Sequence, residues 1–163
     1  GSYHFVDLGG SNVLNLSAGN YYFDRLTTGG SNVFNFDLTN GAISLFITGN
    51  VHLGNSLDVN LIGGDASDVY AETKGNWVQD GSSQWFGTIY GSGAGSDLNF
   101  GASNMLTGAF YATHNLSMGG SGSVNLLALA PPAPGNSVPE PGSMLLAAIA
   151  LCGLAAARRR TRA

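Results

Sequence analysis

The stretch Gly9-Gly10-Ser11-Asn12-Val13-Leu14-Asn15-Leu16 returns twenty residues later as Gly29-Gly30-Ser31-Asn32-Val33-Phe34-Asn35-Phe36. Six of the eight positions are identical, and at the other two phenylalanine replaces leucine. A looser pair, Gly87–Tyr90 and Gly108–Tyr111, recurs at almost the same spacing. Short apolar segments that repeat with a period of this size are typical of a parallel β-helix or β-solenoid, in which stacked coils of chain share one core.

A second regularity is a triplet in which asparagine stands between two apolar residues. Because side chains alternate between the two sides of a strand, the apolar pair should face inward and the asparagine outward. Stacked outward asparagines can then form hydrogen bonds along the solenoid axis. The triplets are Leu14-Asn15-Leu16, Phe34-Asn35-Phe36, Val59-Asn60-Leu61, Leu98-Asn99-Phe100 and Val124-Asn125-Leu126.

The alternative fold is an antiparallel β-sandwich, which also contains short alternating strands and turns rich in glycine and asparagine. Hairpin folds have no reason to keep a fixed period, so the repeat favours the solenoid. No segment before residue 140 shows a helical period. We assign Phe34, Phe36 and Phe100 to the core.

The composition divides the 163-residue chain into three regions. Residues 1–130 are predicted to form the solenoid domain, 131–138 a proline-rich linker, and 139–163 a tail with a hydrophobic helix. No secretory signal peptide is visible at the start, so we expect the domain to be N-terminally truncated. The single cysteine, Cys152, lies in the tail, and the domain therefore contains no disulfide.

Charge is also distributed unevenly along the chain. Residues 1–130 contain nine acidic and two basic residues, a net charge of −7, whereas residues 131–163 carry a net charge of +3. An acidic domain repels phosphate backbones, and this argues against nucleic acid as a partner.

The tail combines a proline-flanked glutamate, an uncharged apolar run and a basic end. The run from Met144 to Ala157 would span about 21 Å as a helix, less than a hydrocarbon core of about 30 Å. Arginine side chains can extend the effective span, and basic residues stay on the cytoplasmic side. The predicted membrane helix is anchored by Met144, Leu145, Leu146, Ile149, Leu151 and Leu154, and its cytoplasmic stop consists of Arg158, Arg159, Arg160 and Arg162.

These three parts, in this order at the C-terminus, resemble the PEP-CTERM sorting signal. The resemblance implies export in a Gram-negative bacterium and a transient intermediate in the inner membrane. It implies that an exosortase recognises Pro139, Glu140 and Pro141 and removes the tail. The released protein would then associate with exopolysaccharide, biofilm, the extracellular matrix or the cell surface.

The domain itself has a fainter resemblance to another family. The segment from Trp85-Phe86-Gly87 to Phe110-Tyr111-Ala112 is similar to the C-terminal coils of choice-of-anchor-A-type surface proteins. That resemblance implies an extracellular, adhesin-like passenger.

Motifs for catalysis are missing from the sequence. It has no Gly-x-Ser-x-Gly elbow, P-loop or dinucleotide fingerprint, and none of its three histidines stands in a zinc-binding pair. Asp65, Asp68 and Glu72 are close enough in sequence to supply a glycosidase carboxylate pair. Asp65 and Asp68 on their glycine turn are also a weak calcium candidate, since calcium prefers hard oxygen ligands.

We therefore expect a structural or adhesive exported protein that is not an enzyme and requires no cofactor. The alternatives are a carbohydrate-active β-helix enzyme and a carbohydrate-binding module. An exposed strip of aromatic side chains would favour the binding module, although most aromatic residues in a repeat fold belong to the core. The candidates for such a strip are Tyr21, Tyr22, Trp77, Trp85, Phe86, Tyr90, Phe110 and Tyr111.

Overall fold

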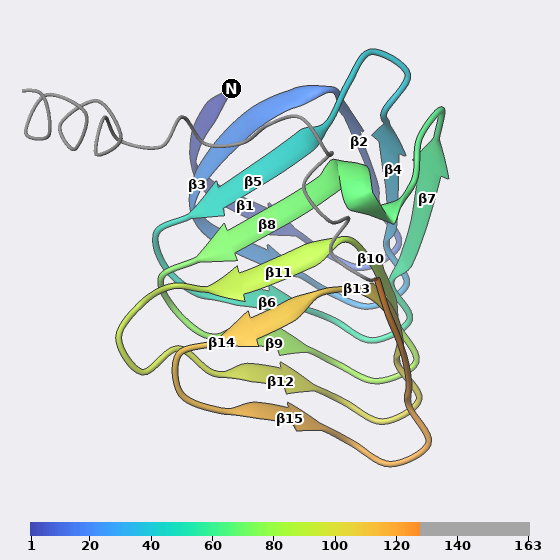
Figure 1. Cartoon of the computed structure of the whole chain (residues 1–163). Helices are drawn as coiled ribbons and strands as arrows, with labels where there is room; N and C mark the ends of the chain where they lie inside the picture. The colour runs from blue at the N-terminus through green and yellow to red at the C-terminus, as the bar shows by residue number, and fades with distance from the viewer. Residues whose placement is uncertain (128–163) are drawn as a thin grey trace, which may run out of the picture. The chain divides into compact units, whose positions relative to one another are not determined.

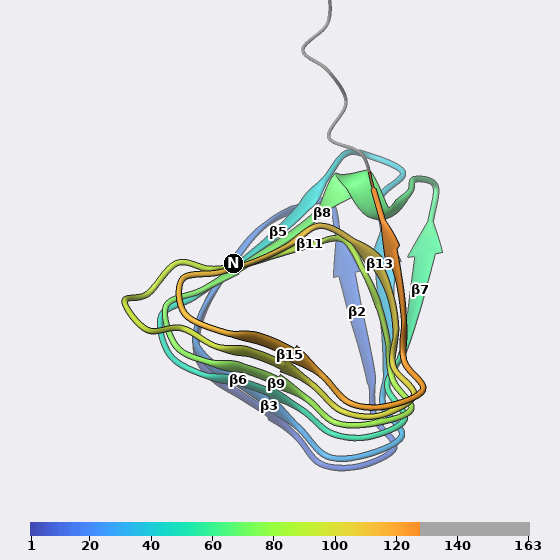
Figure 2. The ribbon, with the colours of Figure 1, turned by 60° about the horizontal axis from the view of Figure 1, so that its bottom comes forward.

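A computed structural model describes residues 1–127 of the chain. They form an all-β solenoid of about six turns, and all of the strand pairs are parallel. The predicted solenoid is therefore confirmed, and the antiparallel sandwich is excluded. Viewed along the axis, the coils overlie one another and enclose a three-sided interior (Figure 1, Figure 2). No helix within residues 1–127 is long and apolar enough to cross a membrane; the predicted membrane helix at 144–157 lies outside the described residues.

Three faces, each a stack of short parallel strands, make up the wall of the solenoid. The first face consists of β3 (Gly19–Thr28), β5 (Ile43–Ile47), β8 (Val69–Thr73), β11 (Thr88–Gly91) and β14 (Phe110–Ala112). The second face continues from the later half of β3 into β6 (Val51–Leu53), β9 (Trp77–Gln79), β12 (Leu98–Phe100) and β15 (Leu116–Met118). The first strand, β1 (Ser2–Leu8), pairs with β3 along its whole length.

The third face is built from two three-stranded sheets. Its strands are β2 (Val13–Ser17), β4 (Val33–Asp37), β7 (Asp58–Ile62), β10 (Gln84–Phe86), β13 (Met105–Gly108) and β16 (Ser123–Leu126). The one short helix among the described residues, a 3-10 turn labelled η1 (Ala66–Asp68), lies between β7 and β8.

The repeat in the sequence is the register of the solenoid. Leu14 of β2 pairs with Phe34 of β4, as the first repeat predicts. The next step along this face is longer, since Phe34 pairs with Val59 at an offset of 25. The offset is 18 between Leu98 and Leu116 on the second face. A constant period is therefore wrong beyond the first coils, because the corners accommodate different lengths of chain while the strands stay in register.

The core is a column of apolar side chains from all three faces. Phe34 and Phe36 are fully buried and Phe100 nearly so, which confirms their assignment. Trp77 and Trp85 are also fully buried and meet edge to face, with ring centroids 4.8 Å apart. Burial of such large side chains contributes about 1.5–3 kcal/mol each and is the main stabilisation of a stacked fold.

The triplet rule holds in the interior coils and reaches its limit at the last described coil. Val124 pairs with the buried Leu106, so its side chain points inward, yet it is 45% exposed and Leu126 is 70% exposed. Their exposure contradicts burial of this triplet, because no described strand lies beyond β16 to cover it.

On the outside of the third face, the predicted asparagine ladder is present. Asn35 donates from Nδ2 to Oδ1 of Asn15 at 2.8 Å, and Asn60 donates to Oδ1 of Asn35 at 2.9 Å. The side-chain amides thus form hydrogen bonds between neighbouring coils, in the same direction as the backbone hydrogen bonds of the strands that carry them. The ladder ties the first three coils together.

A second feature that repeats from coil to coil, and was not predicted from the sequence, is a serine at the corner before the third face. Every coil has a serine there with φ between 57° and 63°, in the left-handed region that non-glycine residues seldom adopt. These are Ser11, Ser31, Ser56, Ser82, Ser103 and Ser121. At the position after the serine, Asn32 and Asn104 are fully buried. The Oδ1 atom of each buried asparagine accepts a hydrogen bond at 2.8 Å from a backbone N–H of the preceding coil. These buried amide oxygens therefore have hydrogen-bond partners.

Candidate functional site

One outward column on the first face is composed mainly of aromatic side chains. Strand register places Tyr22 of β3 beside Phe46 of β5, and Phe46 beside Glu72 of β8. Glu72 in turn pairs with Tyr90 of β11, and Tyr90 pairs with Tyr111 of β14. We name these five residues the aromatic column. It crosses five successive coils, so side chains from distant parts of the sequence share one surface.

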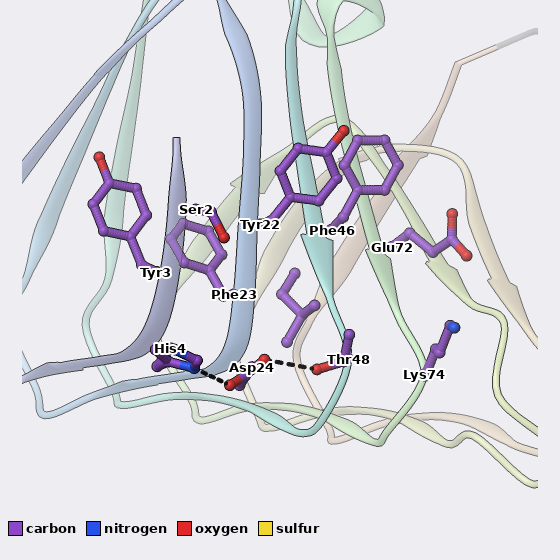
Figure 3. A pocket seen from close by; sticks show the side chains of 11 residues that line it. Ser2, Tyr3, His4, Tyr22, Phe23, Asp24, Phe46, Thr48, Glu72 and Lys74 are labelled. Atoms are coloured by element: carbon purple, nitrogen blue, oxygen red, sulfur yellow. Dashed lines mark hydrogen bonds and ion pairs between the residues drawn. The ribbon is translucent and has the colours of Figure 1, made fainter.

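The tyrosines of the aromatic column are open to solvent. Tyr22 is 49% exposed, Tyr90 37% and Tyr111 45%, whereas Phe46 and Glu72 are half-buried. The rings of Tyr22 and Phe46 are stacked, with centroids 5.2 Å apart and planes inclined by 17° (Figure 3). Neighbouring β-strands set the spacing of these rings, so the column presents a strip of aromatic side chains with one carboxylate, Glu72, in its middle.

A depression of about 310 Å³ lies at the N-terminal end of this column. Three polar side chains on one wall are linked by hydrogen bonds (Figure 3). His4 Nδ1 lies 2.8 Å from Asp24 Oδ2, and Thr48 Oγ1 donates to Asp24 Oδ1 at 3.3 Å. The hydrogen bond from His4 lowers the pKa of Asp24 below its ordinary value. Asp24 is therefore ionised at neutral pH and places a negative charge in the lining of the depression.

Two further ionisable side chains line the other wall. Glu72 accepts a hydrogen bond from the Tyr70 hydroxyl at 3.0 Å, and Lys74 follows Glu72 closely along the chain. Burial and the adjacent Glu72 carboxylate raise the pKa of Tyr70 to about 12. The Tyr70 hydroxyl thus remains a hydrogen-bond donor to Glu72, and this wall of the depression combines the Glu72 carboxylate with the Lys74 ammonium group.

The eight aromatic candidates from the sequence separate into three groups. Trp77 and Trp85 belong to the core, as most were expected to. Tyr21, Phe86 and Phe110 are half-buried. Of the eight, only Tyr22, Tyr90 and Tyr111 are exposed, and strand pairing aligns all three in the aromatic column.

Phe46, Tyr70 and the contact between His4 and Asp24 were not predicted from the sequence. The signal for the last of these was present, because His4 and Asp24 are separated by the same offset as Leu14 and Phe34. Phe46 follows a longer coil, at an offset of 24 from Tyr22, so a constant period could not align the two.

The acidic turn at Asp65 and Asp68 is organised as a capping box around η1. Asp65 Oδ1 accepts the backbone N–H and hydroxyl of Ser67 at 2.7 and 2.6 Å, and Asp68 Oδ2 accepts the N–H of Asp65 at 3.1 Å. These bonds satisfy the free donors at the start of the turn. The hydrogen bonds from Ser67 lower the pKa of Asp65. Both carboxylates therefore stabilise their own turn. The weak calcium assignment stays a prediction.

All three histidines lie on the surface, each beside an aspartate of a neighbouring coil. His52 Nε2 is 3.3 Å from Asp80, and His114 Nδ1 is 2.8 Å from Asp97. Within residues 1–127, no group of three or more histidine, cysteine, aspartate or glutamate side chains is arranged to hold a metal ion. Each histidine thus links its coil to a neighbouring coil through a contact with an aspartate.

The fold and the C-terminal sequence together define an exported β-solenoid that carries a sorting tail. Comparison with protein families confirms the sorting tail, because a model of the PEP-CTERM protein-sorting motif matches residues 137–160. The chain therefore carries a PEP-CTERM sorting motif, and the motif implies export, membrane-associated processing and an exosortase as processing partner.

Much of the solenoid is also covered by a family model. A domain of unknown function (DUF7305) matches residues 4–84, from the first strand to the start of β10. No curated protein and no solved structure matches the chain. The fainter resemblance to choice-of-anchor-A-type proteins is consequently not confirmed by any homologue.

The predicted recognition residues Pro139, Glu140 and Pro141 fall within the matched motif. The apolar run from Met144 to Ala157 and three of the four arginines also fall within it, while Arg162 lies beyond residue 160. All of them are outside the described residues, so their individual roles remain predictions.

Proposed function

We propose that this protein is a structural or adhesive component of the cell surface or extracellular matrix, released there after an exosortase removes its tail. The sorting motif at residues 137–160 carries this proposal. In it, Pro139-Glu140-Pro141 is the recognition element, the apolar run is a transient inner-membrane anchor, and the arginine cluster is the cytoplasmic stop. Biofilm is the proposed setting, in a Gram-negative host.

The solenoid supports such a role through its rigidity and its repeated outer surfaces. Each coil pairs with its neighbours through backbone hydrogen bonds and shares one continuous core, so the faces keep their spacing. A passenger of this kind presents several parallel columns of side chains to a large partner. The aromatic column and the asparagine ladder are two such columns.

We further propose that the protein is not an enzyme. The Asp65 and Asp68 carboxylates, which were the enzyme candidates, are occupied by the backbone of their own turn. Glu72 is engaged with Tyr70 on the first face. Neither arrangement provides the two free carboxylates across a cleft that glycoside hydrolysis requires.

The test is to follow the labelled full-length precursor in its native host. Glu140→Gln should leave the protein uncut in the inner membrane, because it removes the charge between the two prolines. Glu72→Gln is the matched control, since it changes the only other glutamate of the chain and should leave processing unchanged. Normal release of the E140Q protein, or accumulation of both variants in the cytoplasm, would contradict the proposed sorting.

A further inference from the structure

The aromatic column is specific to the first face and is not a by-product of the fold. The equivalent outward column of the third face begins with Asn15, Asn35 and Asn60. On the second face, the outward column contains no Phe, Tyr or Trp and consists of Thr27, His52, Val78, Asn99 and Ser117. Because the core is filled by inward side chains, exposed rings gathered on one face indicate a contact surface.

The column has the dimensions of an extended ligand. Adjacent strands lie about 4.8 Å apart, so the four steps from Tyr22 to Tyr111 cover about 19 Å. Its tyrosines combine an apolar ring with a hydroxyl group. Small polar residues flank it on the same face, since Ser44 and Thr88 are paired with Tyr70 in the neighbouring outward column. A sugar ring has the complementary chemistry, with an apolar face of C–H groups and a rim of hydroxyls.

Electrostatics restrict the ligand further. The described residues include nine carboxylates but only Arg25 and Lys74 as permanent cations on side chains. In the depression beside the column, Asp24 and Glu72 face the same space as Lys74. An anionic chain with one charge per sugar would be repelled along its length. An uncharged chain avoids this repulsion and can donate hydroxyl hydrogens to the carboxylates.

We propose that the first face of the solenoid binds an uncharged polysaccharide, which lies along the solenoid axis with its sugar rings against Tyr22, Tyr90 and Tyr111. The depression lined by Asp24 and Glu72 holds one end of the bound segment through hydrogen bonds to sugar hydroxyls. This inference deepens the proposed surface role and rests on it, because it identifies the class of matrix component that the exported domain contacts.

Native affinity electrophoresis of the purified full-length chain tests the proposal. The gels contain one of three uncharged polysaccharides (mixed-linkage β-glucan, galactomannan or dextran) or the anionic polysaccharide alginate. We expect at least one uncharged polysaccharide to retard the chain, with little sensitivity to salt, and alginate to have no effect. The double variant Tyr22→Ala/Tyr111→Ala should bind at least tenfold more weakly.

The matched control is Phe5→Ala, which removes an exposed ring that packs on Arg25 instead of joining the column. It should leave binding within a factor of two, and urea unfolding of each variant shows whether the fold is retained. A folded Tyr22→Phe/Tyr111→Phe variant should keep most of the affinity, because the rings remain.

Several results would overturn the proposal. They are no retardation by any of the three uncharged polysaccharides, retardation by alginate alone, or equal losses in the column variant and the F5A control. The assay uses purified protein and does not depend on tail processing. A failure of binding with normal sorting would therefore reject this inference and leave the proposed exosortase-dependent export intact.

Discussion

The left-handed serine at each corner leads to a quantitative prediction at Ser31. Its φ is 59° and its side chain is exposed, so substitutions there change backbone strain with little change in burial. A non-glycine residue in this region costs about 1–2 kcal/mol, with β-branched residues at the unfavourable end. We expect Ser31→Val to lower the free energy of unfolding by about 1 kcal/mol. Ser31→Gly should change it by less than about 0.5 kcal/mol, because relief of strain offsets the greater entropy of the unfolded chain.

Urea denaturation of the purified chain, followed by tryptophan fluorescence, measures the effect. With a slope of about 2 kcal/mol/M, a loss of about 1 kcal/mol lowers the midpoint by about 0.5 M urea. Ser44→Val is the matched control, because Ser44 lies in the extended strand β5, where valine is favoured. If S31V and S44V unfold at the same urea concentration as the parent chain, the left-handed corner does not carry the strain assigned to it.

Four further predictions concern other parts of the solenoid. Asn35→Ala removes both hydrogen bonds of the outer ladder and should lower the free energy of unfolding by about 1–2 kcal/mol, measured by urea denaturation; an unchanged midpoint would mean that the ladder adds no stability. Phe36→Ala empties a fully buried site and should cost about 3–5 kcal/mol in the same assay, and a loss below about 1 kcal/mol would show that the core collapses around the deletion. Because the folded pKa of Asp24 lies below its ordinary value, its contribution to stability is complete above that ordinary value and is lost as the pH falls through the folded pKa. Asp24→Asn should therefore reduce the decline in stability below about pH 4; equal declines in both proteins would refute this. In an absorbance titration of the folded chain, Tyr70 should ionise late, near its pKa of about 12, and Glu72→Gln should shift that late step to lower pH; an unmoved step would remove Glu72 as a cause.

The parts of the fold that depend on side-chain alternation could be predicted from the sequence. The repeat at Gly9–Leu16 and Gly29–Phe36 identified the stacking partner of β2, and the asparagine between apolar residues identified the outer ladder. Both inferences rest on the alternation of side chains along a strand, which leaves a direct trace in the order of apolar and polar residues.

The candidate site could be predicted only in part, because it depends on coil length. Tyr90 and Tyr111 follow the spacing recognised in the looser repeat, whereas Tyr22, Phe46 and Glu72 are separated by offsets of 24 and then 26. No local rule sets the length of a corner, so the column forms only when the register of every coil is known. The corner serines were overlooked for another reason, since serine is common in ordinary turns and nothing in its identity signals a positive φ.

The unequal corners have a practical consequence for engineering. Strand register survives even though the offset between paired strands ranges from 18 to 26, so the wall tolerates added chain wherever it turns. The segment 92–97, between β11 and β12, projects beyond the other coils at the junction of the first two faces (Figure 2). Lengthening a surface loop costs little free energy, about 0.6 kcal/mol for each doubling. This segment is a natural graft point for a reporter peptide or an antibody epitope, displayed on a scaffold whose own sorting motif directs it to export.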